Sequence, residues 1–422
     1  MQSRHALSVL MLSMEYSPEI SGGVGTHVQE LSAGLARSGD RVAVLACAAG
    51  KTEKMVEGNK SVYLLAPTQV QNTQAASTIV NGILAFNKNL VSYARETVLR
   101  EWGVPDLIQC YNWLTFPAAY ELGSSLHVPV ICTIGFLSEP CERWWGQAPD
   151  LEIVKQERLA CRKADRLIAV TNSMRSIVQS THTVSDDKID VVYNAMDLEA
   201  FSVDNASPQL LSRLRATIAP NGEKIILYAG RLNPQKGISA IFESIPQVVA
   251  HYPNVKYVFA GEPDSQRFAA ELRKMFDQDQ TLKARTILLG KLPRRKLAAL
   301  YKIADVALVP SVYEPFGYAA IEAMAMSVPL VATDAGGLSE VVDQEKTGLT
   351  VPVHALEDGT RGVDIPALTL ATTRMLEDEP FSREMAGAAR EKVRTVFGVE
   401  KMVHATRAVY ETAISEFELQ YA

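Results

Sequence analysis

The sequence places two cations close together after a glycine turn. In the run Tyr228-Ala-Gly-Arg-Leu-Asn-Pro-Gln-Lys-Gly237, Arg231 and Lys236 stand five residues apart at the expected start of a helix. Fixed positive charge and the N–H groups of a helix amino terminus attract an anion to the same place. The spacing therefore indicates a diphosphate site, although a solvated loop would also carry Arg and Lys at its surface.

A second segment supplies two carboxylates. In Pro310-Ser-Val-Tyr-Glu-Pro-Phe-Gly-Tyr-Ala-Ala-Ile-Glu322, Glu314 falls in a turn after the apolar run 306–309, and Glu322 falls about one turn inside the next helix. Carboxylates accept hydrogen bonds from paired hydroxyl groups, such as those of sugars and ribose. Because open α/β sheets bind ligands at the carboxyl ends of their strands, the segment predicts a hydroxyl-binding crevice. The alternative is that Glu314 caps the helix and Glu322 faces water.

A third candidate is the glycine-rich run Ser21-Gly-Gly-Val-Gly-Thr-His27, which follows an apolar run and opens a helix. Its glycines would let backbone N–H groups approach a phosphate, but a strand-to-helix turn also needs glycine without any ligand. A dinucleotide site is excluded by two departures from its fingerprint. Val28 stands at the third glycine position, and no acidic residue follows the second apolar run, which ends at Gly50.

The elements that must position these residues are short apolar runs between amphipathic stretches. Continuous apolar runs predict parallel strands covered by helices on both faces. The pattern runs once through the first half of the chain and restarts at residue 224, so it predicts an α/β protein of two doubly wound units with a boundary near residue 200. The expected strands are 8–12, 41–45, 105–108, 128–132, 166–170, 189–192, 224–229, 255–260, 286–289, 306–309 and 329–332. The polar stretch from Asn194 to Asn221, with Pro208 and Pro220, suits a linker followed by one helix before the second sheet begins. The stretch from about residue 400 to 418 is expected to form an amphipathic helix.

Composition limits the class of protein. The 422 residues are 47% hydrophobic and 21% charged, which is typical of a folded globular chain. A net charge of −6 gives no general attraction to nucleic acid. The five cysteines lie in the first half without C-x-x-C spacing, and we expect reduced thiols in a cytoplasmic protein. The sequence predicts no transmembrane helix and leaves contact with a membrane surface open.

Five motifs, in this order, resemble the retaining, nucleotide-sugar-dependent glycosyltransferases of family four, the superfamily of glycogen synthase and sucrose synthase. The motifs are Pro18-x-x-Ser-Gly-Gly-Val-Gly25, Val192-Tyr-Asn-Ala-Met-Asp-Leu-Glu-Ala-Phe201, Gly230-Arg-Leu-x-x-x-Lys-Gly237, the E-x7-E pair Glu314 and Glu322, and Thr333-Asp-Ala-Gly-Gly-Leu-Ser-Glu340. The resemblance spans nearly the whole chain. It implies a GT-B fold, in which two Rossmann-like domains face each other across a cleft.

The resemblance also implies a division of labour. Residues 1–200 would form the acceptor-side domain and 201–399 the nucleotide-sugar-binding domain, with the helix of about 400–422 packing back onto the first. The catalytic residues would be Arg231 and Lys236, which hold the donor diphosphate, and Glu314, which holds the transferred sugar.

Further donor contacts are implied at six positions. The backbone of Phe316 and Gly317 would assist Glu314, and Glu322 would bind the ribose. Gly23 would let the first-domain loop approach the phosphates, and Lys291 with Leu292 would border the nucleobase.

Departures from the family pattern concern the acceptor side. Polysaccharide-forming relatives carry Lys where this chain has Ser21 and His where it has Gly135, so glycogen or starch synthesis is in doubt. Gly135 would leave room for another sugar or acceptor. Trp144 and Trp145 could stack on a sugar or lipid, and His27 could face the cleft, but packing roles are the commoner fate of such residues.

No cofactor and no metal ion are expected. Asp277-Gln-Asp279 has the spacing of a metal-binding pair but falls at the end of an expected helix, 268–276. The expected reaction passes a sugar from a nucleotide diphosphate to an acceptor, a small molecule or glycan precursor. A non-catalytic nucleotide-sugar-binding protein and an epimerase of the same fold remain as alternatives, and the sequence predicts no oligomeric state.

Overall fold

The structure, a computed structural model, describes residues 5–17, 22–48, 50–66, 76–144, 146–203 and 207–421. It divides into two compact units. Unit 1 comprises Met1–Glu142, Ala148–Ala195 and Val399–Ala422, and unit 2 comprises Arg143–Gln147 and Met196–Gly398. Apart from the short segment Arg143–Gln147, the chain passes from unit 1 to unit 2 between Ala195 and Met196, slightly before the expected residue 200, and returns between Gly398 and Val399.

Unit 1 is built on an eight-stranded sheet with the order β3-β4-β2-β1-β5-β6-β7-β8. All neighbouring strands are parallel except β3 and β4, which form an antiparallel pair at one edge. The strands are β1 (Ser8–Ser13), β2 (Arg41–Cys47), β3 (Glu53–Glu57), β4 (Lys60–Leu65), β5 (Leu107–Tyr111), β6 (Val130–Ile134), β7 (Arg166–Ala169) and β8 (Ile189–Val191).

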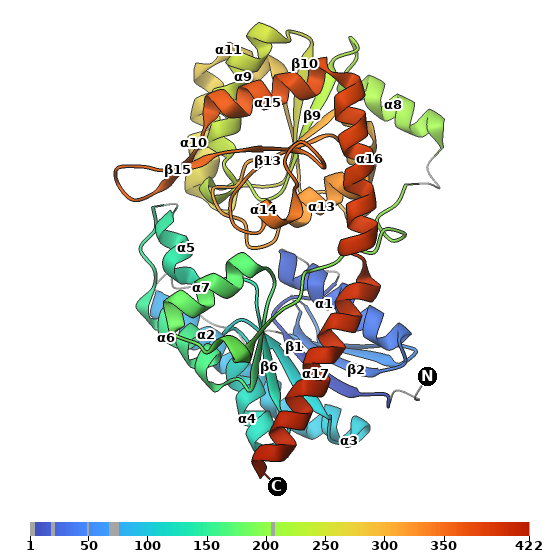
Figure 1. Ribbon diagram of the computed structural model, residues 1–422, viewed down its shortest axis with the longest axis vertical. Helices are drawn as coiled ribbons and strands as arrows, with labels where there is room; N and C mark the ends of the chain where they lie inside the picture. Colours follow the sequence, from blue (N-terminus) through green and yellow to red (C-terminus); the bar gives the residue numbers. More distant parts are fainter. Residues whose placement is uncertain are drawn as a thin grey trace. The chain divides into compact units, whose positions relative to one another are not determined.

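Helices cover the sheet of unit 1, as Figure 1 shows. They are α1 (Gly23–Arg37), α2 (Ala76–Tyr93), α3 (Leu99–Trp102), α4 (Phe116–Leu126), α5 (Ser138–Trp144), α6 (Leu151–Lys163), α7 (Asn172–His182) and α17 (Val399–Tyr421); a π-helical turn, Ala94–Val98, joins α2 to α3. The core joins side chains of β1, α1 and α17, among them Met11, Leu31 and Val403. A segment from the end of the chain thus completes the core of its first unit.

Polar side chains inside unit 1 hold α17 in place. The guanidinium of Arg407 forms an ion pair with Asp40, and both side chains are almost fully buried. The hydroxyl of Tyr410 donates to the side-chain oxygen of Gln109. A buried charge left without its partner is costly, so these contacts fix one position of α17 on the sheet.

Unit 2 has a six-stranded, all-parallel sheet with the order β11-β10-β9-β12-β13-β14. Its strands are β9 (Lys224–Ala229), β10 (Val255–Ala260), β11 (Thr286–Gly290), β12 (Val306–Val309), β13 (Leu330–Thr333) and β14 (Leu349–Val351), and a separate hairpin pairs β15 (Val353–Ala355) with β16 (Arg361–Val363). Its helices are α8 (Pro208–Ile218), α9 (Ile238–His251), α10 (Gln266–Gln278), α11 (Gln280–Arg285), α12 (Arg294–Ile303), α13 (Tyr318–Ala325), α14 (Leu338–Val341), α15 (Ile365–Glu377) and α16 (Glu379–Val396). Chain order reverses between β9 and β12, which makes their carboxyl ends the topological switch point where such sheets bind ligands.

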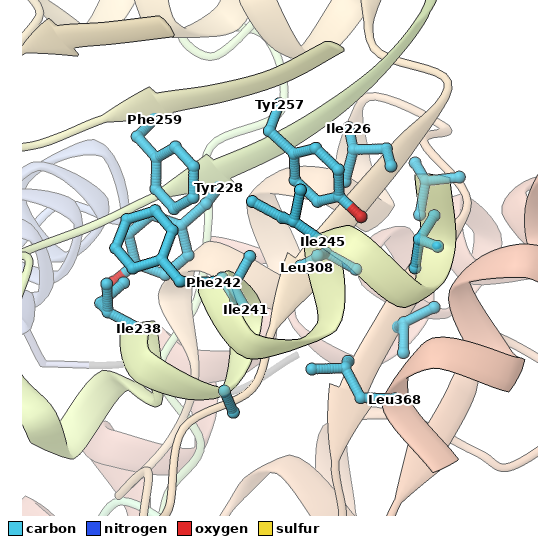
Figure 2. Close-up of a cluster of buried hydrophobic side chains, with 14 of the residues drawn as sticks. Ile226, Tyr228, Ile238, Ile241, Phe242, Ile245, Tyr257, Phe259, Leu308 and Leu368 are labelled. Carbon is cyan, nitrogen blue, oxygen red and sulfur yellow. The ribbon is translucent and has the colours of Figure 1, made fainter. Parts of the chain in front are cut away.

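The core of unit 2 lies between this sheet and α9 (Figure 2). The rings of Phe242 and Phe259 lie 5.0 Å apart, and the ring of Tyr228 lies 5.7 Å from Phe259. Aromatic packing of this kind holds the end of β9 rigidly against the start of α9. The loop between those two elements carries Arg231 and Lys236.

The structure confirms each predicted strand within a few residues and the two-sheet α/β architecture. Strands β5 and β6 begin later than predicted, after Pro105 and Pro129. Five strands were not predicted: β3 and β4, β14, and the β15 and β16 strands of the separate hairpin. None of the helices in the described ranges has the length and apolar character needed to cross a bilayer. All five cysteines are outside any disulfide.

The close contact between α1 and α17 depends on Gly34. A Cβ atom at this position would lie 2.6 Å from Val403 Cγ2 and 2.7 Å from Val399 Cγ1. Valine side chains are stiff and cannot swing aside without moving the helix. We predict that Gly34→Ala lowers the unfolding free energy of unit 1 by about 1–3 kcal/mol, the usual cost of overpacking, measured by calorimetric or urea unfolding.

The control is Gly387→Ala on α16, where an added Cβ would meet nothing within 4 Å. This exposed helical position should be unchanged or gain up to about 1 kcal/mol, since alanine is the better helix former. Equal stability of Gly34→Ala and the natural chain would contradict the packing described for α1 and α17.

Candidate active site

The predicted catalytic cation and carboxylate of unit 2 meet at the topological switch point. Lys236 follows β9 and Glu314 follows β12, and the distance from Lys236 Nζ to Glu314 Oε2 is 2.5 Å. Their side chains are 19% and 13% exposed. The hydroxyl of Ser311 donates to the same carboxylate oxygen at 3.2 Å. The structure therefore places a largely buried ion pair where an α/β sheet of this order binds its ligand.

The loop after β9 is shaped by a cap and a glycine. The side chain of Asn233 accepts a hydrogen bond from the Lys236 amide, and Gly237 has a φ of 66° at the start of α9. A Cβ on Gly237 would stand 1.8 Å from the carbonyl oxygen of Pro310. Only glycine fits this contact and this backbone conformation. The β9 and β12 loops can therefore touch, which brings Lys236 to Glu314.

Arg231 lies earlier in the same loop. Its side chain is exposed, while its carbonyl oxygen accepts a hydrogen bond of 2.7 Å from the buried hydroxyl of Tyr228. Within the described ranges, no ion pair involves the Arg231 guanidinium. The loop thus presents one cation paired with Glu314 and a second cation exposed at the surface of unit 2.

Two loops interlock behind Glu314. The Gly337 amide donates to the Glu314 carbonyl at 2.7 Å, and a Cβ on Gly336 would lie 2.4 Å from that same oxygen. Gly336 also has a φ of 61°, which favours glycine. The glycine pair in the run 333–340 therefore supports the backbone of the carboxylate loop.

Phe316 and Gly317 connect Glu314 to α13. The Phe316 side chain is 2% exposed and packs edge-on against Phe397, so only the backbone of Phe316 is available to a ligand. Gly317 has a φ of 113°, and a Cβ there would meet Leu338 at 2.7 Å. Both predicted residues thus lie in the turn that opens α13.

Glu322 lies on α13 and accepts a hydrogen bond of 3.2 Å from the hydroxyl of Tyr301. Burial raises the pKa of Glu322 to about 7, against smaller lowering effects of Arg294 and of this hydrogen bond. The carboxyl is therefore poised between its neutral and charged forms near pH 7. A ligand that binds next to Glu322 would therefore change how much of its carboxyl is charged.

Lys291 and Leu292 follow β11, the edge strand two positions away from β9. Lys291 is exposed and Leu292 half-buried. The structure records no contact that brings either residue to the Lys236–Glu314 pair, so their nucleobase role stays a prediction.

In unit 1 the predicted anion site at the start of α1 holds an internal carboxylate. Gly23 is the first residue of the helix, and the amides of Gly22 and Gly25 donate to Glu15 Oε2 at 3.1 and 3.3 Å. Glu15 was not predicted to take part. Its carboxylate satisfies N–H groups that the helix itself leaves without partners. Ser21 lies outside the described residues.

His27 lies one turn further along α1 and is 4% exposed. Burial lowers its pKa to about 4, against an opposing hydrogen bond with Asn194, and its ring meets Tyr111 edge-on at 5.4 Å. The imidazole is therefore neutral at physiological pH. His27 therefore packs in the interior of unit 1, and its role on the acceptor side stays a prediction.

Gly135 begins a turn after β6. This turn is held by Asn112, which was not predicted to take part. The side-chain oxygen of Asn112, which has a left-handed φ of 51°, accepts from the amides of Gly135 and Phe136 at 2.9 and 3.3 Å. A Cβ on Gly135 would meet nothing within 4 Å. A side-chain carbon at this position would therefore be unobstructed, and the use of the space by a sugar or acceptor stays a prediction.

Trp144 is the last residue of α5, most of which lies in unit 1, but it falls in the segment Arg143–Gln147 of unit 2 and not in the acceptor-side unit where it was expected. The Arg361 guanidinium lies 3.8 Å from the centre of the Trp144 ring, and the ring of Tyr313 lies 4.8 Å away. One face of the indole is therefore covered by a cation from the β15–β16 hairpin. Trp145 lies outside the described residues.

The pair Asp277 and Asp279 is divided between two helices. Asp279 caps α11, where its side chain accepts from the amides of Thr281 and Leu282 at 2.7 and 3.1 Å. In the described part of the chain, no group of three or more His, Cys, Asp or Glu side chains could hold a metal ion.

Comparisons with known proteins cover both units. Residues 21–200 match the family described as "Glycosyltransferase Family 4", and residues 213–392 match "Glycosyl transferases group 1". The chain is 28% identical over 422 residues to a glycogen synthase of Mycobacterium tuberculosis, covering 96% of this chain and 95% of the relative.

Solved structures share the fold. A sucrose-phosphate synthase from Thermosynechococcus elongatus has a TM-score of 0.79 at 22% identity, covering 97% of this chain and all of that one. Anabaena HepE in complex with UDP and glucose has a TM-score of 0.73 at 17% identity, covering 96% and 100%. Two family matches that together span both units, with a shared fold along the whole chain, show that the protein is a family 4 glycosyltransferase with the GT-B fold.

Proposed function

We propose that this glycosyltransferase takes a sugar from a nucleotide-diphosphate sugar and passes it, with retention at the anomeric carbon, to a small molecule or glycan precursor. The observation that carries the proposal is the Lys236–Glu314 ion pair at the carboxyl ends of β9 and β12. The pair lies where open α/β sheets bind ligands, and the loop that carries Lys236 also carries the exposed cation Arg231. The complex of HepE with UDP and glucose supports this class of donor.

Donor binding would exchange the partners of Lys236. A diphosphate carries more negative charge than one carboxylate, so it would take over the Lys236 ammonium and recruit Arg231. Glu314 would then be released to accept hydrogen bonds from sugar hydroxyls, with Ser311 still positioned beside it. Lys236 would thereby bind the diphosphate and Glu314 the sugar, on the two sides of the bond that breaks.

Arg231 and Lys236 would stabilise the transition state more than they stabilise the bound donor. As the bond between the anomeric carbon and the phosphate oxygen breaks, negative charge grows on the departing diphosphate, where Arg231 and Lys236 stand. The acceptor hydroxyl attacks from the same face and forms the new bond to the anomeric carbon. Its proton passes to the departing phosphate oxygen, so the step needs no separate base and no metal ion.

The acceptor side would be formed by unit 1. The open space at Gly135 and the fixed turn that follows it would admit a group where polysaccharide-forming relatives carry a histidine. His27 would contribute as a neutral imidazole, since burial lowers its pKa to about 4. An acceptor other than glycogen or starch follows from this difference, in a protein that we expect to work in the cytoplasm.

The experiment that tests the function is a screen of nucleotide sugars by thermal stabilisation and slow hydrolysis, followed by NMR of the released sugar. A donor at 100 times its dissociation constant should stabilise the protein by about 2.7 kcal/mol. The first-formed anomer should keep the configuration of the donor. An inverted anomer would refute retention, a new nucleotide sugar formed without acceptor would indicate an epimerase, and binding without turnover a non-catalytic protein.

Arg231→Ala should lower turnover of the identified donor by orders of magnitude, because it removes charge that stabilises the leaving group. Arg295→Ala, an exposed cation on α12, is the matched control and should leave turnover unchanged. Near-normal turnover of Arg231→Ala would remove its phosphate role.

Glu322 gives a prediction about pH. Its pKa of about 7 means that the carboxyl is mostly neutral at pH 6 and charged at pH 8. Ribose hydroxyls donate best to the charged form, so affinity for the ribonucleoside diphosphate should rise over this range, up to about tenfold for a one-proton equilibrium. Titration calorimetry at pH 6 and at pH 8 would measure this change in affinity.

The 2′,3′-dideoxy nucleotide is the control, because it keeps the phosphates and lacks the hydroxyls. The ratio of the affinity of the dideoxy nucleotide to that of the ribonucleotide should therefore fall as the pH rises. If the ratio of the two affinities stays constant between pH 6 and 8, Glu322 does not bind the ribose.

A further inference from the structure

Helix α6 of unit 1 exposes a stripe that the reaction does not use. The stripe, called here the α6 face, consists of Leu151, Lys155, Arg158, Leu159, Arg162 and Lys163, all of them exposed. Their spacing of four, three, one, three and one residues is that of one side of an α-helix. The opposite side of α6 is packed into the unit through Val154, Glu157, Ala160 and Cys161, so the α6 face has a fixed outward orientation.

Positive charge dominates the α6 face although the whole chain carries −6. The exposed acid of α6 is Glu152, next to this face, whose carboxylate lies 3.6 Å from the Lys155 ammonium. Among the described residues, the side chains of Arg158, Arg162 and Lys163 have no ion-pair partner. These charges also act on His182 of α7: burial, together with Arg158 and Arg162 and against the opposing effect of Glu139, lowers the pKa of His182 to about 4.

Two leucines stand among these cations. Leu151 is 76% exposed and Leu159 is 45% exposed, which leaves much of their apolar surface in water. A nucleic acid or another polyanion would neutralise the cations without covering the leucines. The surface of an anionic bilayer offers phosphate headgroups to the cations and an apolar layer beneath them to the leucines.

The helix is rigid enough to present this surface. The side chain of Asp150 caps its amino terminus by accepting from the amides of Glu152 and Ile153 at 2.8 and 3.4 Å. At the other end the Lys188 ammonium donates to the carbonyl of Arg162 at 2.7 Å. Inside, Glu157 is 2% exposed and accepts from the Ser138 amide at 2.8 Å. Helix α6 lies on the outside of unit 1, next to α2 and α7 (Figure 1).

We infer that the α6 face is a docking surface for an anionic lipid membrane. The cations contact the headgroups, and Leu151 and Leu159 enter the interface between headgroups and acyl chains. The binding is peripheral and reversible, because four cations and two leucines supply far less than a membrane-spanning helix. It is independent of the donor chemistry of unit 2.

The test is flotation of the full chain with vesicles of phosphatidylcholine, with and without 30% phosphatidylglycerol, at 50 and 500 mM salt. The chain should bind only the vesicles that contain phosphatidylglycerol, and 500 mM salt should release most of it. The triple variant Lys155→Gln/Arg158→Gln/Arg162→Gln should lose on the order of 100-fold in partitioning, about fivefold for each cation. Leu151→Ser/Leu159→Ser should weaken binding at low salt without removing the preference for phosphatidylglycerol.

The matched control removes three exposed cations from a helix of unit 2, Arg295→Gln/Lys296→Gln/Lys302→Gln. It should bind vesicles as the natural chain does. Absence of binding at 50 mM salt, equal binding to both kinds of vesicle, or equal loss in the control would each overturn the proposal. Binding to heparin but not to vesicles would also overturn it and would indicate a different polyanion. Nucleotide affinity, measured on the same variants, should not change, and this separates membrane docking from the proposed function.

Discussion

The ion pair between Lys236 and Glu314 is the interaction on which the proposed chemistry depends. Two opposite charges, each less than one-fifth exposed, are held together by loops that follow separate strands. Removing such charges from water is costly unless each has a partner. Each side chain therefore keeps the other in place until a ligand offers Lys236 a stronger anion.

Glycines make this pairing sterically feasible. Gly237 lets the β9 loop touch the carbonyl of Pro310, and Gly336 lets the β13 loop touch the carbonyl of Glu314. Both glycines have positive φ values, so space and backbone conformation impose the same choice of residue. The aromatic core under α9 then fixes the whole assembly to the sheet (Figure 2). A rigid site of this kind stabilises charge without reorganising during the reaction.

Sequence reasoning predicted the strands and the loops that carry Lys236 and Glu314 because both depend on local patterns, but it did not predict that these two side chains form an ion pair. Long apolar runs mark buried parallel strands, and a strand end fixes where the next residues lie. The β3–β4 hairpin escaped prediction since β3, Glu53–Glu57, is an exposed edge strand rich in charge. The β15–β16 hairpin escaped because its strands have three residues each.

The backbone partners of two side-chain oxygens were beyond prediction for a different reason. Glu15 at the start of α1 and Asn112 at the turn of Gly135 act through side-chain oxygens that accept backbone amides. Glu15 meets the amides of Gly22 and Gly25 where β1 connects to α1, and Asn112 meets amides that follow the neighbouring strand β6. No local sequence pattern marks either pairing. The raised pKa of Glu322 is likewise a product of burial, which spacing alone does not show.

The exchange of partners at Lys236 can be measured directly by titration calorimetry of the nucleoside diphosphate that corresponds to the identified donor. The proteins compared are the natural chain, Glu314→Gln, Lys236→Met and the double variant. Because Glu314 competes with the diphosphate, Glu314→Gln should bind the nucleotide about tenfold more tightly, and the gain should vanish when Lys236 is absent. Weaker or unchanged binding by Glu314→Gln in the presence of Lys236 would contradict the account.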